Sequence, residues 1–68
     1  MSQALPSGVA PNTMDNDTQR LRKMVTNTYT WGGLVGASNL EDINGTDNST
    51  TLIRKLENNL YQIRLVAP

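Results

Sequence analysis

The sequence DNSTTLIRKLENNLYQIRLV, from Asp47 to Val66, decides the fold of this chain. Four apolar residues in it follow one another at spacings of three, four and three positions: Ile53, Leu56, Leu60 and Ile63. This spacing puts their side chains on one side of a helix. Because Asp, Asn and Ser are common N-cap residues, the polar residues 47–49 indicate where the helix begins. We therefore predict a C-terminal amphipathic helix over about 49–63.

The end of the same stretch also fits a strand. Tyr61, Ile63 and Leu65 alternate with polar residues, which is the pattern of a half-buried strand. We expect the helix to continue to about Ile63, and a strand over 61–66 is the alternative.

The apolar stripe has the spacing of a coiled coil, with Ile53 at heptad position a. It spans barely two heptads, fewer than the three or four that define a coiled coil. Leu52, Leu65 and Val66 widen the apolar surface beyond a two-stranded seam. We therefore expect the stripe to pack against several helices or another protein body.

Two regions precede this helix. Residues 1–13 hold Pro6, Gly8 and Pro11 within six positions, a composition that excludes a regular helix or a central strand. We predict an extended or disordered arm there, with Val9 as one anchor, and a small helical assembly region over 14–68. Within that region, acidic and amide residues before the run 19–25 predict a helix over about 15–26.

The middle of the chain has a different character. Residues 26–31 are rich in Thr, Tyr and Trp and alternate, which predicts a short strand or an extended connector. We expect a glycine-rich loop over 32–36 and a polar turn over 38–48. Ser38 and Glu41 have the spacing of a capping box, so a single helical turn over 38–43 is an option.

Composition excludes several classes of function. The chain has 68 residues, no cysteine, no histidine and zero formal net charge. Disulfides and thiolate or imidazole metal ligands are therefore excluded. Six basic residues in a neutral chain do not favour nucleic-acid binding, because phosphate neutralisation dominates that affinity. No apolar run has the length of a membrane span, and the N-terminus lacks the pattern of a signal peptide, so the sequence indicates no localisation.

No pattern of residues suits catalysis, a metal or a nucleotide. The glycines over 32–36 lack the Lys-Ser/Thr ending of a phosphate-binding loop. A calcium loop counted from Asp42 would end at Ile53 instead of the required Glu. We therefore expect no enzyme activity, no cofactor and no small-molecule substrate.

The remaining expectation is association with other protein chains. A chain of this length without disulfides or metal has a marginal core, so we expect its order to depend on self-association or a partner. The predicted interface residues are Trp31, Leu52, Ile53, Leu56, Leu60 and Ile63. In composition the chain is similar to cement, connector or fibre-attachment components of virus and phage particles, which makes a structural assembly role the first hypothesis. The alternative is a cellular adaptor that presents its amphipathic helix to one partner.

Overall fold

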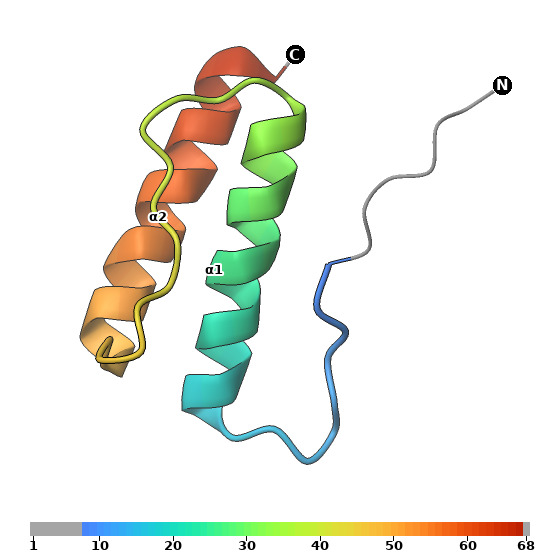
Figure 1. The fold of residues 1–68 in the computed structure, drawn as a ribbon, viewed down its shortest axis with the longest axis vertical. Helices are drawn as coiled ribbons and strands as arrows, with labels where there is room; N and C mark the ends of the chain where they lie inside the picture. Colours follow the sequence, from blue (N-terminus) through green and yellow to red (C-terminus); the bar gives the residue numbers. More distant parts are fainter. Residues whose placement is uncertain (1–7, 68) are drawn as a thin grey trace, which may run out of the picture.

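The computed structural model describes residues 8–67, which form two helices and their connections (Figure 1). Helix α1 spans Asp17–Leu34 and helix α2 spans Ser49–Val66, and each has 18 residues. No strand occurs among the described residues. The small, mainly helical fold class predicted from the sequence is therefore confirmed.

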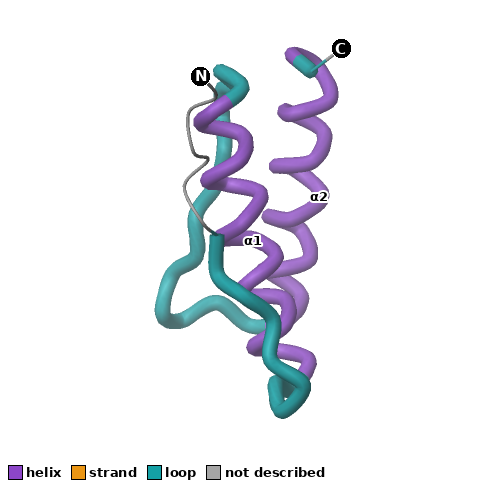
Figure 2. Tube along the Cα trace, turned by 90° about the vertical axis from the view of Figure 1, so that its right-hand side faces the viewer, coloured by secondary structure: helices purple, strands orange, loops and turns teal. Residues whose placement is uncertain are grey.

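The two helices lie side by side and run in the same direction (Figures 1 and 2). Their N-terminal ends meet at a 3.2 Å hydrogen bond between the Thr18 and Ser49 hydroxyls. The connection over 35–48 therefore returns along the length of the pair before α2 begins. The segment before α1 also runs back along its own helix.

Both helices begin at an asparagine N-cap. The Asn16 side chain accepts a hydrogen bond from the Gln19 backbone N–H at 2.8 Å, and the Gln19 side chain accepts one from the Asn16 N–H, which completes a capping box. The Asn48 side chain accepts from the Thr51 N–H at 2.9 Å. The predicted start of the second helix near residue 49 is confirmed.

A glycine ends helix α1. Gly36 has a φ of 80°, and the N–H of the following Ala37 donates to the Gly32 carbonyl at 2.9 Å. This is a Schellman C-cap, in which the left-handed residue satisfies the last helical carbonyls without the steric cost of a Cβ atom.

Five predictions about local structure are wrong, and three of them concern the end of the first helix. Residues 26–31 are helical, not a strand or extended connector, and Gly32 and Gly33 belong to the helix. Packing overrides strand propensity here, because Thr28 and Gly32 are buried and the Thr28 hydroxyl donates to helix carbonyls. The first helix therefore ends at Leu34 and not near residue 26.

The other two corrections concern the second half. Residues 38–43 form no helical turn, since Asn39 has a φ of 58° and the backbone of Glu41 is bound to a side chain of α2. The strand alternative over 61–66 is wrong, because α2 continues to Val66 and Ile63 is buried on it. The predicted arm over 1–13 lies partly outside the described residues; its part from residue 8 is neither helix nor strand.

The core between the helices is small. Val25 and Leu52 are completely buried and Ile63 nearly so, and two polar side chains, Thr28 and Asn59, are buried with them. Gly32 allows a close approach, because a Cβ atom there would lie 2.6 Å from the Leu40 side chain. One face of each helix and the connection at Leu40 and Glu41 thus supply the buried contact.

Candidate protein-interaction surface

The molecule consists of two copies of one structural unit. Unit 1 comprises residues 8–34 and unit 2 residues 40–66, and each contains an irregular segment, a turn and a helix. Helices α1 and α2 begin 32 positions apart and end 32 positions apart. The same offset relates the two sequences.

Eight of the 18 positions in 12–29 are identical to those in 44–61. The shared pattern is N-x-x-D-N-x-T-x-x-x-R-K-x-x-x-N-x-Y. The identical pairs are Asn12 and Asn44, Asp15 and Asp47, Asn16 and Asn48, Thr18 and Thr50, Arg22 and Arg54, Lys23 and Lys55, Asn27 and Asn59, and Tyr29 and Tyr61.

The first repeated feature is an ion pair that closes the turn before each helix. In unit 1, Lys23 Nζ donates to Asp15 Oδ2 at 2.6 Å and to the Ala10 carbonyl at 3.0 Å. In unit 2, Lys55 Nζ donates to Asp47 Oδ2 at 2.7 Å and to the Asp42 carbonyl at 2.9 Å. Each lysine therefore ties its irregular segment to its own helix.

These ion pairs change the acidity of the two aspartates. The hydrogen bond from Lys23 holds the pKa of Asp15 below its ordinary value of 3.8, and backbone hydrogen bonding at Asn12 acts in the same direction. The hydrogen bond from Lys55 lowers the pKa of Asp47 in the same way, with backbone hydrogen bonding at Asn44 as the next contribution. Burial opposes both shifts without reversing them.

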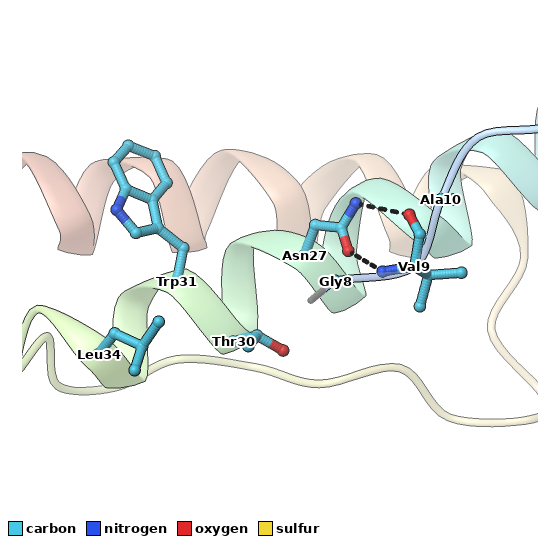
Figure 3. A pocket seen from close by; sticks show the side chains of 7 residues that line it. All are labelled: Gly8, Val9, Ala10, Asn27, Thr30, Trp31 and Leu34. Atoms are coloured by element: carbon cyan, nitrogen blue, oxygen red, sulfur yellow. Dashed lines mark hydrogen bonds between the residues drawn. The ribbon is translucent and has the colours of Figure 1, made fainter. Parts of the chain in front are cut away.

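The second repeated feature is an asparagine that pairs with a segment of backbone. Asn27 accepts from the Val9 N–H at 2.7 Å and donates to the Val9 carbonyl at 3.1 Å, as Figure 3 shows. Asn59 accepts from the Glu41 N–H and donates to the Glu41 carbonyl, both at 2.8 Å. A carboxamide can do this because it offers one acceptor and one donor side by side.

The surroundings of the two asparagines differ. Asn59 is completely buried, and its amide also donates to the Thr28 hydroxyl of α1 at 3.3 Å. Asn27 remains partly exposed. Unit 2 is covered by the helix of unit 1, whereas no described residue covers unit 1 in the corresponding way.

The uncovered side of unit 1 combines three exposed apolar side chains with a charged and a polar one. We call it the front face and define it by Val9, Arg20, Met24, Asn27 and Trp31. A groove there is lined by seven residues: Gly8, Val9, Ala10, Asn27, Thr30, Trp31 and Leu34. Figure 3 shows Trp31 and Leu34 at one end of this groove and the paired Asn27 and Val9 at the other. The Trp31 side chain is 49% exposed, an unusual position for the one tryptophan of the chain.

The second uncovered surface lies on α2. We call it the rear face and define it by Ile53, Glu57, Leu60 and Arg64. Ile53 is 44% exposed and Leu60 is 46% exposed, while Glu57 and Arg64 are also exposed. These four positions correspond to Leu21, Val25, Thr28 and Gly32, of which the last three are buried and Leu21 is half-buried.

The predicted interface residues divide between the core and the surface. Leu52 and Ile63 are buried and Leu56 is half-buried, whereas Trp31, Ile53 and Leu60 are exposed. The side of α2 toward α1 is thus offset from the predicted stripe. The sequence prediction did not identify Asn27, Asn59 or the two Lys–Asp pairs; the 32-residue repeat is the signal that would have found them.

Other classes of site have little support in the described part of the chain. No group of three or more His, Cys, Asp or Glu side chains lies close enough to hold a metal ion among residues 8–67. Neither helix is long and apolar enough to cross a membrane. Comparison with protein families, with curated proteins and with solved structures found no match for this chain.

Proposed function

We propose that this chain is a non-enzymatic structural protein that takes part in a larger protein assembly through its exposed helix faces. The observation that carries the proposal is the imbalance between its buried and exposed apolar side chains. Three hydrophobic residues are buried in the described structure, but twelve large hydrophobic residues are exposed. Exposed apolar surface gathered on helix faces is typical of protein–protein contact sites.

The polar residues support the same proposal. Asp15 and Asp47 pair with lysines of their own units, and Glu41 makes a two-fold hydrogen bond with Arg54 at 2.8 and 3.2 Å. These side chains hold turns and segments in place. Their arrangement therefore supports a structural role for these three carboxylates.

Sedimentation velocity and native mass spectrometry of the full chain over a wide concentration range test the proposal. We expect association to increase with concentration, and thermal stability to increase with it, because binding to the folded state stabilises that state. A single chain at every concentration, with a cooperative and concentration-independent melting transition, would contradict the proposal. A chain that stays single but binds one defined protein in a 1:1 complex would favour the adaptor alternative.

A further inference from the structure

We propose, as an extension that rests on the proposed function, that a second copy of this chain binds head to tail. In this arrangement the front face of unit 1 in one copy covers the rear face of α2 in the next copy. The contact would repeat the packing that already joins α1 to unit 2 within one chain. Each internal contact then has a counterpart between copies, made by the residues that the 32-residue offset puts in its place.

Two of the three side-chain hydrogen bonds between the units have suitable replacements, whereas the bond from Asn59 to Thr28 has none, because its counterparts are Asn27 and the apolar Leu60. Internally, the Arg22 guanidinium donates to the Asn44 carbonyl at 3.2 Å. Between copies the corresponding groups are Arg54 and the Asn12 carbonyl, so donor and acceptor are unchanged. The internal contact between the Thr18 and Ser49 hydroxyls becomes Thr50 with Asp17, and a hydroxyl can donate to a carboxylate.

The two fully buried apolar residues are replaced by opposite charges. Val25 of α1 and Leu52 of α2 are each completely buried. Their counterparts are Glu57 on the rear face and Arg20 on the front face, and both are exposed. The two surfaces that would meet therefore carry charges of opposite sign, which keeps them complementary.

The close contact between Gly32 and Leu40 also has a counterpart, but the large and the small side chain change places. Internally, Gly32 makes space for Leu40. Between copies Arg64 stands where Gly32 stood and Gly8 where Leu40 stood, so the large side chain moves to the opposite surface. Exposed apolar residues fill the remaining positions, with Ile53 and Leu60 on the rear face and Met24 and Trp31 on the front face.

This geometry is heterologous, because two different surfaces of the chain meet. Repeated contacts of this type produce an open row of copies, or a ring where the rotation between copies closes. A two-fold dimer formed through the front face alone would instead stop at two chains.

A charge exchange between two variants tests the arrangement. In Arg20→Glu, the front face would carry a carboxylate toward the rear face that holds Glu57; in Glu57→Arg, the rear face would carry a guanidinium toward the front face that holds Arg20. We expect each variant alone to need at least about tenfold more protein than wild type to associate, since like charges that face each other oppose binding. We expect an equimolar mixture to associate more strongly than either variant alone, because the new carboxylate and the new guanidinium can face each other across a mixed contact.

Asp42→Arg is the matched control, since it makes the same charge change as Glu57→Arg on the connecting segment, outside both faces. It should associate like wild type, and circular dichroism should show equal helicity for every variant. Unimpaired single variants, or a mixture that associates no better than either variant alone while wild type associates, would overturn the head-to-tail arrangement and leave the assembly role standing. Arg20→Glu impaired with Glu57→Arg unaffected would overturn it in favour of the two-fold dimer.

Discussion

Units 1 and 2 have the same local construction but different surroundings, and the difference shows what each contact contributes. Both contain an asparagine N-cap, a Lys–Asp pair and an asparagine that binds a backbone segment. Only unit 2 has a described helix packed over these features, and its Asn59 is completely buried. Equivalent substitutions in the two units therefore compare the same local interaction in an open and in a covered environment.

The largest expected difference concerns Leu52 and its counterpart Arg20. Leu52 is completely buried, so Leu52→Ala should lower the free energy of unfolding by roughly 2–5 kcal/mol through lost burial and a residual cavity. Arg20 is exposed, and Arg20→Ala should change the free energy of unfolding by less than about 0.5 kcal/mol. Urea denaturation, at a concentration where native mass spectrometry detects single chains, measures both. Equal effects would mean that the two units are covered alike.

The predicted apolar stripe on α2 shows which features of the fold can be predicted from the sequence and which cannot. Helical spacing and the cap residues were sufficient to place α2, and residues 15–17 located the start of α1 to within two positions. The side of α2 that packs inward could not be found from spacing alone. Leu52 and Ile63 line the contact with α1, while Ile53 and Leu60, which share a periodic stripe with Ile63, are exposed.

The strand predicted over residues 26–31 failed for a related reason. Intrinsic preference for extended backbone is weak compared with burial, and Thr28 and Gly32 provide the small surface that α2 and Leu40 need. The asparagine contacts join residues 18 positions apart, so they depend on tertiary structure. Comparison of the two halves at an offset of 32 would have revealed them, because a pattern repeated with its polar residues intact marks a repeated structure.

The second prediction compares the two asparagines. Asn59→Ala should destabilise the fold by roughly 1–3 kcal/mol, because it leaves the N–H and carbonyl of Glu41 without their partner in a partly buried place. Asn27→Ala should cost less than about 1 kcal/mol, because water can reach the Val9 backbone. Denaturant midpoints measure the difference, and protection of the Glu41 amide from hydrogen exchange should fall in Asn59→Ala. A larger loss in Asn27→Ala would place the covered environment on unit 1.

The smallest expected effect is the pH dependence that the two Lys–Asp pairs confer. Each aspartate has a pKa in the folded state below its ordinary value of 3.8. The folded state therefore binds fewer protons than the unfolded state near this pH, so both pairs stabilise the fold above pH 3.8, and their contribution is lost as the pH falls through the folded pKa values. Asp47→Asn and Asp15→Asn should each reduce the midpoint of urea unfolding at neutral pH, and the difference from wild type should shrink as the solution is acidified.

We expect the larger reduction in Asp47→Asn, because the Lys55 and Asp47 side chains are 11% and 8% exposed, against 26% and 10% for Lys23 and Asp15. Water screens the more exposed pair more strongly, so the same charge interaction contributes less in unit 1. Asp42→Asn is the control, since it removes a carboxylate that forms no ion pair among the described residues. Equal losses in Asp47→Asn and Asp15→Asn would mean that the Lys–Asp pair acts locally, and that the cover over unit 2 affects its asparagine but not its ion pair.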